Sequence, residues 1–84
     1  MISWGATLCA STHDVENPAF PLVIRSVRIG AEAWVAAEAF VGPGVTVGEG
    51  AVLGARGVAM KDLDAWSYYG GNPAECLKPR PRFP

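Results

Sequence analysis

The chain has 84 residues, of which 50% are hydrophobic and 18% are charged, and its formal net charge at pH 7 is −1. This length accommodates one small domain, the hydrophobic content excludes an intrinsically disordered segment, and the 10 glycines and 7 prolines favour a turn-rich β fold over a helical bundle. The basic residues are scattered until Lys78, Arg80 and Arg82, so the chain lacks the basic stripe of nucleic-acid-binding proteins, and no nucleic-acid partner is expected.

Two further kinds of protein are disfavoured by the sequence. No apolar run reaches the ~18 residues of a membrane span, and the N-terminus has no basic region followed by an apolar core, so we expect a cytoplasmic protein without membrane insertion. Cys9 and Cys76 lack the paired spacing of a zinc site or a redox motif, so we expect buried or idle thiols rather than a structural disulfide.

The first candidate element is a short apolar segment in which Ile2 and Leu8 are six positions apart. Residues 10–22 follow without this spacing, and their polar and proline residues predict a loop. The loop carries His13, the single histidine of the chain. Because repeat folds often place insertions on a functional face, His13 is a candidate functional residue, with a solvated loop histidine as the alternative.

A period of six residues then runs through the middle of the chain, with a weaker beginning at Val23. Aliphatic residues occupy one position of each hexad: Ile29, Val35, Val41, Val47 and Leu53. The next position holds a small residue: Gly30, Ala36, Gly42, Gly48 and Gly54. The position four after the aliphatic residue is occupied by Ala33, Ala39, Val45, Ala51 and Gly57. Such a fixed period predicts a repeat fold in which the aliphatic side chains point inward.

Residues 31–41, taken alone, would suit an amphipathic helix equally well because they are rich in Ala and Glu. The continuation argues against a helix, since Pro43 would break it and each of the four glycines in residues 42–50 would destabilise it by about 1 kcal/mol. Pro43 and Gly44 instead suit the central positions of a type II turn, where the second residue needs a positive φ. We therefore expect each hexad to be a short strand and a corner, and three hexads to make a triangular coil. This pattern predicts a parallel β-helix but not its hand.

The hexads resemble the [LIV]-[GAED]-x-x-[STAV]-x repeat of the left-handed β-helix acyltransferases, and residues 41–48 are a strong instance of it. Residues 60–63, followed by residues 71–74, resemble the C-terminal signature of the branch that contains maltose, galactoside and colanic-acid acetyltransferases. The resemblance covers residues 2–78. It implies an all-β, left-handed parallel β-helix in residues 1–78 with the catalytic loop 10–22 inserted, a short Pro- and Arg-rich tail at 79–84, and a homotrimer.

The resemblance also implies an acetyl-CoA-dependent O-acetyltransferase that acts on a hydroxyl of a sugar or polysaccharide precursor. Residues 11–14, Ser-Thr-His-Asp, are similar to the catalytic loop of these enzymes, which makes His13 the general base. An imidazole with the ordinary pKa of about 6.5 is mostly neutral at pH 7 and can accept the proton of an attacking hydroxyl. Asp14 is a candidate for orienting its ring, although a sequence neighbour can equally point away.

Six residues match coenzyme-binding positions of the family: Trp34 beside the thioester, Ala37 and Ala55 along the pantetheine arm, Lys61 and Lys78 near the phosphates, and Met60 where relatives often place a hydroxyl residue. The structural alternatives are a packing tryptophan, repeat alanines and solvated lysines. Glu75 stands where some relatives carry a basic residue, and a carboxylate near phosphates disfavours binding. No metal is expected. The zinc carbonic anhydrases that share this fold bind their metal with three histidines, and this chain has one.

Members of this family carry further coils before the segment that the chain matches. We therefore expect the 84 residues to lack an N-terminal part and to be a weak enzyme and an unstable monomer by themselves, since repeat folds usually need about three or more units. A truncated, non-catalytic remnant of such an enzyme is the alternative function.

Overall fold

The computed structural model describes residues 1–13, 19 and 22–81, with the backbone alone for residues 11–13 and 22–24. In this described part every regular element is a β-strand and there is no helix, which confirms the all-β class. The strands are β1 (Thr7–Leu8), β2 (Ser11–His13), β3 (Leu22–Ile24), β4 (Arg28–Ile29), β5 (Trp34–Val35), β6 (Phe40–Val41), β7 (Thr46–Val47), β8 (Val52–Leu53), β9 (Val58–Ala59), β10 (Ser67–Gly70) and β11 (Glu75–Pro79). The described residues include no helix that is long and apolar enough to cross a membrane.

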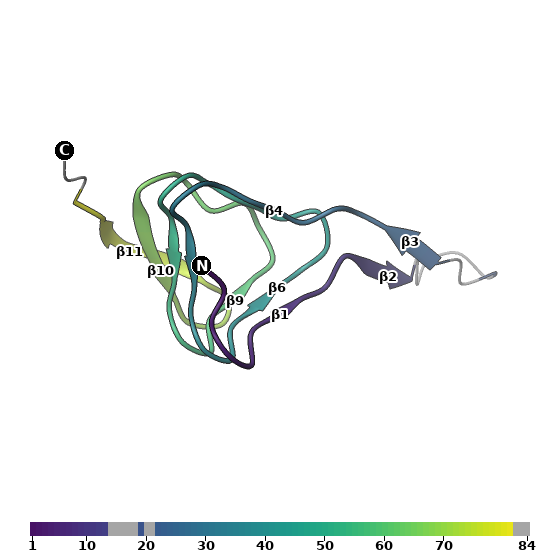
Figure 1. Cartoon of the computed structure of the whole chain (residues 1–84). Helices are drawn as coiled ribbons and strands as arrows, with labels where there is room; N and C mark the ends of the chain where they lie inside the picture. The colour runs from purple at the N-terminus through teal and green to yellow at the C-terminus, as the bar shows by residue number, and fades with distance from the viewer. Residues whose placement is uncertain (14–18, 20–21, 82–84) are drawn as a thin grey trace.

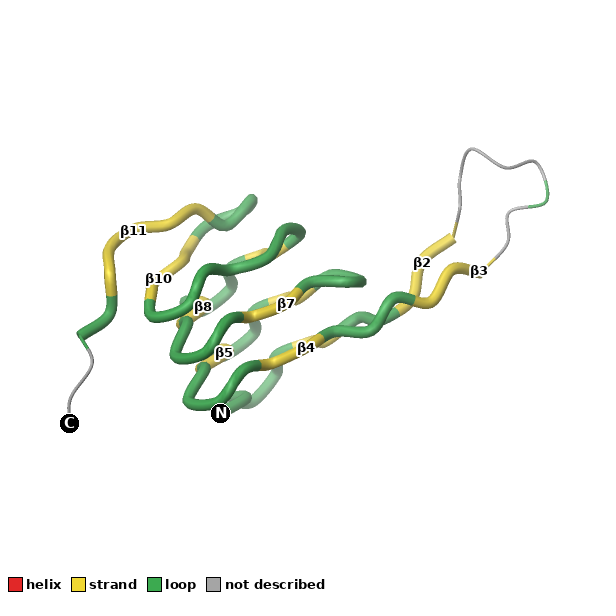
Figure 2. Tube along the Cα trace, turned by 90° about the horizontal axis from the view of Figure 1, so that it is seen from above, coloured by secondary structure: helices red, strands yellow, loops and turns green. Residues whose placement is uncertain are grey.

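Most strands pair in parallel with a strand that lies one circuit of the chain away. Arg28 of β4 pairs with Thr46 of β7, and Trp34 of β5 pairs with Val52 of β8, so the partners are 18 residues apart. β6 pairs with β9 at the same spacing. Figure 1 shows the chain passing three sides of a triangle, and Figure 2 shows the successive circuits stacked on one another. We call one such circuit a coil. The six-residue period therefore marks short parallel strands, and the helix considered for residues 31–41 is ruled out because β5 and β6 occupy it.

The interior of the coils is filled by two rows of side chains from each hexad. The first row was expected and is fully buried: Val35, Val41, Val47 and Leu53, each 0% exposed. The second row stands two positions before the first: Ala33, Ala39, Val45 and Ala51. Because the interior of a coil is narrow, it accommodates two aliphatic residues from each hexad, and three of the four hexads pair a larger residue with an alanine. Ile29, at the start of the period, is only partly buried.

The corners of the coils are made by one residue in every six with a left-handed backbone conformation. These residues are Glu32, Glu38, Gly44, Gly50 and Arg56, with φ values of 58°, 57°, 73°, 67° and 58°. The positive φ of Gly44 confirms the turn expected at residues 43–44. Successive corners are stacked by backbone hydrogen bonds, such as the 2.8 Å bond that the Gly50 N–H donates to the Ala31 carbonyl.

The first coil is separated from the rest by an inserted hairpin. Ile2 pairs in parallel with Val35 and Leu8 with Val41, so the weak N-terminal echo of the period belongs to a coil. Val23 does not, because it lies in β3, which pairs antiparallel with β2. The expectation that Val23 begins the repeat is wrong. A six-residue spacing indicates a coil only where the strand pairs with a strand one circuit away. Val23 pairs instead with Thr12, in the other arm of the hairpin.

The last coil is closed by a reversal of the chain. β10 pairs in parallel with β8 and antiparallel with β11, so β11 is the edge strand of this side. Tyr69 of β10 reaches the core, and its hydroxyl accepts a 3.0 Å hydrogen bond from the Asp64 N–H. Beyond β11, Arg80 donates from Nη1 to the carbonyls of Glu32 and Gly50 at 2.8 and 3.0 Å. The C-terminal segment therefore crosses back over two earlier coils.

Candidate functional site

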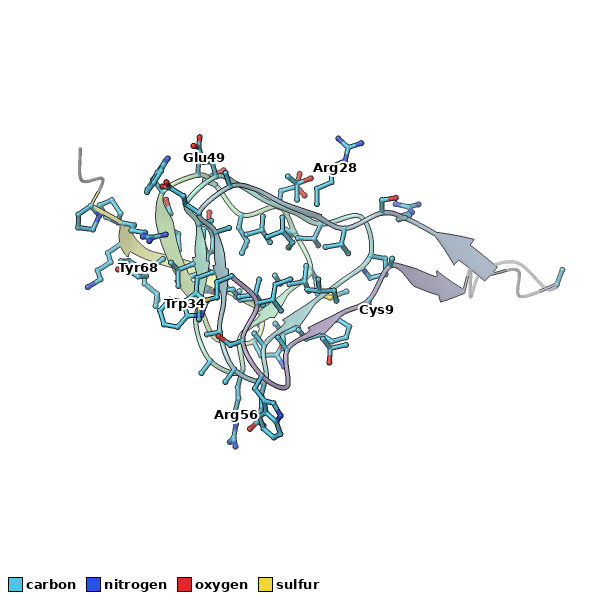
Figure 3. All side chains as sticks on the ribbon, viewed as in Figure 1. Cys9, Arg28, Trp34, Glu49, Arg56 and Tyr68 are labelled. Atoms are coloured by element: carbon cyan, nitrogen blue, oxygen red, sulfur yellow. The ribbon has the colours of Figure 1, made fainter. Side chains whose placement is uncertain are left out.

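One side of the coils carries a row of outward-facing side chains that we call the outer row: Trp34, Val52 and Tyr68. Their chain neighbours Val35, Leu53 and Tyr69 point into the core, and side chains alternate along a strand, so the outer row faces away from it. Trp34 is 42% exposed, whereas Val52, which is flanked by the two aromatic residues, is 5% exposed. Figure 3 shows Trp34 and Tyr68 along the same side of the triangle.

The indole ring of Trp34 is held by a residue of the first coil. Its Nε1–H donates a 2.7 Å hydrogen bond to the hydroxyl oxygen of Ser3. The backbone N–H of Ser3 donates in turn to the Val35 carbonyl at 2.8 Å. The hydroxyl therefore projects from a backbone that is itself fixed next to β5.

Lys78 lies at the far end of the outer row. Its Nζ is 5.1 Å from the centre of the Tyr68 ring, a cation–π distance. The structure thus places Trp34 and Lys78, two of the six expected coenzyme-binding residues, on the same side of the coils.

Ala37 and Ala55 lie together at the corner that follows this side. Both are exposed, and they occupy equivalent positions of successive coils, because the Arg56 N–H donates a 3.0 Å hydrogen bond to the Ala37 carbonyl. The corner is flanked by an ion pair in which Arg56 Nε is 3.5 Å from Glu38 Oε2, with both side chains well exposed. With only a methyl group at each alanine, the backbone of this corner is open to close approach by a ligand.

Met60 and Lys61 lie elsewhere, in a hollow at the C-terminal end of the coils. The hollow has a volume of about 290 Å³ and is lined by Ala59, Met60, Lys61, Asp62, Leu63, Tyr69, Pro73, Ala74, Glu75 and Cys76. Glu75 and the expected cation Lys61 line the same hollow. The carboxylate of Asp62 is held by the Thr46 N–H, which donates a 2.8 Å hydrogen bond to Oδ1. The ionisable carboxylates of the lining outnumber the single lysine, which opposes tight binding of a phosphate there.

His13 stands apart from all of these residues. The structure describes its backbone at the end of β2, in the hairpin that leaves the coils at the corner where the Gly44 N–H donates to the Arg25 carbonyl. Figures 1 and 2 show this hairpin extending away from the coils, whereas β10 and β5, which carry the outer row, lie on the opposite side. Asp14 lies outside the described residues. The general-base role of His13 and the orienting role of Asp14 stay predictions.

Sequence reasoning missed Ser3 and Tyr68 as neighbours of the expected site. Ser3 could have been found by extending the repeat to Ile2, but the inserted hairpin changes the spacing between partners from 18 to 33 residues, as in Ile2 and Val35. Tyr68 follows Val52 by 16 residues rather than 18, so it falls out of the period. Among the described residues, no group of three or more His, Cys, Asp or Glu side chains could hold a metal ion, and Cys9 and Cys76 form no disulfide.

No protein-family model and no curated protein sequence matches the chain. Solved structures do match it. A hexapeptide-repeat acetyltransferase from Vibrio cholerae, solved with acetyl-coenzyme A, superposes with a TM-score of 0.87 at 20% identity and covers 95% of this chain and 45% of its own. An N-acyltransferase from Bacillus cereus, solved with dTDP and 3-hydroxybutyryl-CoA, gives 0.85 at 26% identity, with 96% and 48% covered. A maltose O-acetyltransferase from Clostridium difficile gives 0.79 at 18% identity, with 96% and 59% covered.

The chain spans about half the length of the first two of these proteins. At such identities the likeness concerns the fold, and it extends over nearly all of the described chain. The 84 residues therefore share the fold of the hexapeptide-repeat acetyltransferases, as their repeat and C-terminal motif predicted.

Proposed function

We propose that the chain is a left-handed parallel β-helix that transfers the acetyl group of acetyl-coenzyme A to a hydroxyl of a sugar or polysaccharide precursor. The observation that carries the proposal is the agreement of the fold with the placement of the expected coenzyme residues. The fold matches a hexapeptide-repeat acetyltransferase solved with acetyl-coenzyme A, and the residues expected to contact the coenzyme include an exposed tryptophan beside an alanine corner. Since acetyl-coenzyme A is an intracellular metabolite, the proposal also assigns the protein to the cytoplasm.

The coenzyme is assigned to the side of the coils that carries Trp34. The indole ring would contact the thioester end, and the open backbone at Ala37 and Ala55 would face the pantetheine arm. Lys78, at the end of the outer row, would supply a cation for the phosphates. Lys61 would supply a second and weaker one, because Asp62 and Glu75 line the same hollow and repel a phosphate. Met60, 57% exposed, lines the same hollow as Lys61 and offers an apolar contact to the nucleotide.

The reaction requires one proton acceptor. The acceptor oxygen attacks the thioester carbonyl carbon while its proton passes to the imidazole of His13. The carbon–sulfur bond then breaks, and the thiolate takes the proton from the imidazolium, leaving an acetyl ester and the free thiol of coenzyme A. No residue changes its covalent state, so no activated serine or cysteine is needed.

The opposite placement of β2 and the outer row supports a site shared between copies of the chain. A substrate cannot contact the coenzyme side and the hairpin of one copy at once, because the coils lie between them. A closed ring brings the hairpin of one copy to the coenzyme side of the next, and rings of identical subunits are commonly symmetric. We therefore propose a homotrimer with one site at each interface.

The saccharide acceptor is supported by the relatives, which include a maltose O-acetyltransferase and an N-acyltransferase solved with dTDP. The second of these is named for acylation of nitrogen, so the acceptor assay should offer both hydroxyl and amino sugars. Ester or amide formation is then read from the mass and alkali stability of the product.

The test begins with binding of acetyl-coenzyme A to the purified chain by isothermal titration calorimetry. We expect Trp34→Ala to weaken binding about tenfold or more, because an aromatic side chain that a ligand covers commonly carries a large share of the binding energy. Leu77→Ala is the control, because Leu77 is 68% exposed on β11 and outside the proposed contacts. Thiol release with sugar acceptors then tests turnover. A chain that binds the coenzyme without turnover supports the non-catalytic remnant, and a chain that does not bind it refutes the proposal.

A further inference from the structure

The contact between Ser3 and Trp34 joins two coils through side chains alone. It spans 31 positions of the sequence and is 2.7 Å long, with both groups partly open to solvent. A surface hydrogen bond of this kind competes with water and contributes little to the folded state by itself. The main effect of this hydrogen bond is to restrict the orientation of the indole ring.

The stacking of the first two coils does not depend on the Ser3 hydroxyl. The Ser3 N–H donates to the Val35 carbonyl at 2.8 Å, and the Val35 N–H donates to the Met1 carbonyl at 2.9 Å. These backbone bonds hold the two strands in register whatever side chain follows Ile2. Removing the hydroxyl therefore leaves the coils in place and releases only the ring.

Much of the Trp34 side chain is open to solvent. Trp34 is 42% exposed, and Val52 beneath it offers only apolar contact, which allows rotation about the side-chain bonds. The hydrogen bond from Nε1 fixes one edge of the indole and so selects one orientation of its plane. A ring that is already oriented loses less entropy when a ligand packs against it.

We propose that Ser3 is a positioning residue for Trp34: its hydroxyl holds the indole in the orientation that receives the thioester end of acetyl-coenzyme A. This inference rests on the proposed function, since it assigns Ser3 a part in the same site. It adds a residue of the first coil to a site whose other coenzyme contacts come from later coils.

The experiment compares the parent chain with Ser3→Ala, Ser3→Thr and the control Ser26→Ala, which removes the hydroxyl of an exposed serine before β4. The first readout is the indole N–H signal of Trp34 in a ¹⁵N-resolved NMR spectrum, assigned with Trp34→Phe. The second is the dissociation constant for acetyl-coenzyme A by calorimetry. Thermal unfolding checks that each variant keeps its fold.

We expect Ser3→Ala to move the Trp34 signal upfield, to speed its exchange with solvent and to weaken coenzyme binding about threefold to tenfold. Ser3→Thr keeps the hydroxyl and should restore both readouts, while Ser26→Ala should change neither. The thermal unfolding transition should stay in place for all three variants, because the backbone bonds remain.

The outcomes separate the two proposals. A moved indole signal with unchanged affinity would overturn the positioning role and leave the proposed function standing. An unmoved signal in Ser3→Ala would overturn it as well, because the hydrogen bond would then be absent in solution. If the parent chain does not bind acetyl-coenzyme A, the proposed function fails, and the role of Ser3 in it fails too.

Discussion

Single residues at the corners of the coils carry the backbone strain of this fold. Glu32, Glu38 and Arg56 adopt left-handed conformations that cost a residue with a Cβ roughly 1–2 kcal/mol. Gly44 and Gly50 occupy equivalent corners without this cost. The two glycines differ in their surroundings, since a Cβ at Gly50 would lie 2.4 Å from Cδ2 of Trp66, whereas one at Gly44 would meet Arg25 Cβ at 3.3 Å.

This difference predicts unequal effects of two alanine substitutions. Gly44→Ala should lower the free energy of unfolding by about 1–2 kcal/mol, mainly through the backbone, because the nearest neighbour of the new methyl group is the exposed side chain of Arg25. Gly50→Ala should lower it by at least about 1 kcal/mol more, because the new methyl group clashes with the indole ring. Denaturation by urea measures both, and a Trp66→Ala background should remove the excess. Equal losses for the two variants in the parent background would contradict the close packing of Trp66 on Gly50.

A second prediction at this scale concerns His13. Replacement of a general base typically lowers a rate by about 10²–10⁴, so His13→Ala should reduce acetyl transfer by this factor. The affinity for acetyl-coenzyme A should be unchanged, because the proposed coenzyme contacts lie on the opposite side of the coils. Steady-state thiol release and calorimetry measure the two quantities. Turnover at the parent rate would remove His13 from the mechanism.

At the scale of the elements, the C-terminal segment after β11 crosses three stacked corners, at Glu32, Gly50 and Trp66. We call this segment the strap. The Arg80 side chain donates to the carbonyls of Glu32 and Gly50, and its guanidinium lies 5.4 Å from the centre of the Trp66 ring. The Arg80 N–H also donates to the Trp66 carbonyl at 2.7 Å. One residue therefore ties together corners of three successive coils.

Arg80→Ala should lower the free energy of unfolding by about 1–2 kcal/mol, the range for hydrogen bonds from a charged group together with a partly exposed cation–π contact. Arg80→Lys should recover only part of this loss, because one ammonium group lacks the planar fork that reaches both carbonyls. Arg28→Ala is the matched control, since Arg28 is an exposed arginine on β4. A loss no greater than that of the control would show that the strap does not stabilise the coils.

At the scale of the whole molecule, the hairpin and the outer row lie on opposite sides of the coils. This separation leads to a prediction about how copies of the chain assemble. A site that uses both His13 and Trp34 must draw on two copies of the chain. In such a site, His13→Ala removes the residue that one copy supplies and Trp34→Ala the residue that its neighbour supplies. An interface between one subunit of each variant can then still hold an intact His13 and an intact Trp34.

We expect a co-refolded equal mixture of the two weakened variants to regain roughly a quarter of the parent activity, because an interface in a random ring has a half chance of the intact hairpin and a half chance of the intact tryptophan. Each variant refolded alone is the control. Sedimentation of the mixture reports the number of copies. A mixture no more active than the average of its parts would show that His13 and Trp34 do not act together across an interface.

The expected site could be read from the sequence in part. Trp34, Ala37 and Ala55 lie inside the regular hexads. The period alone therefore places Trp34 on a strand, and Ala37 and Ala55 together at the corner that follows. Lys61 and Lys78 follow the last regular hexad, and the sequence did not show that they lie apart, one in the hollow and one over Tyr68. Glu75 lines the same hollow as Lys61, an arrangement that depends on how β11 reverses against β10.

The sequence by itself determined the all-β class, the inward row of Val35, Val41, Val47 and Leu53, and the corner at Gly44, because each follows from a local pattern of one aliphatic residue and one turn in every six positions. Only the tertiary structure decided the pairing of Ser3 with Trp34, the reach of Arg80 over three corners and the separation of the hairpin from the outer row. These contacts join residues whose spacing the 18-residue period does not give, since an insertion and a shortened last coil shift the register. The period predicts whether a side chain points inward or outward, while the stacking of the coils determines which residues it contacts.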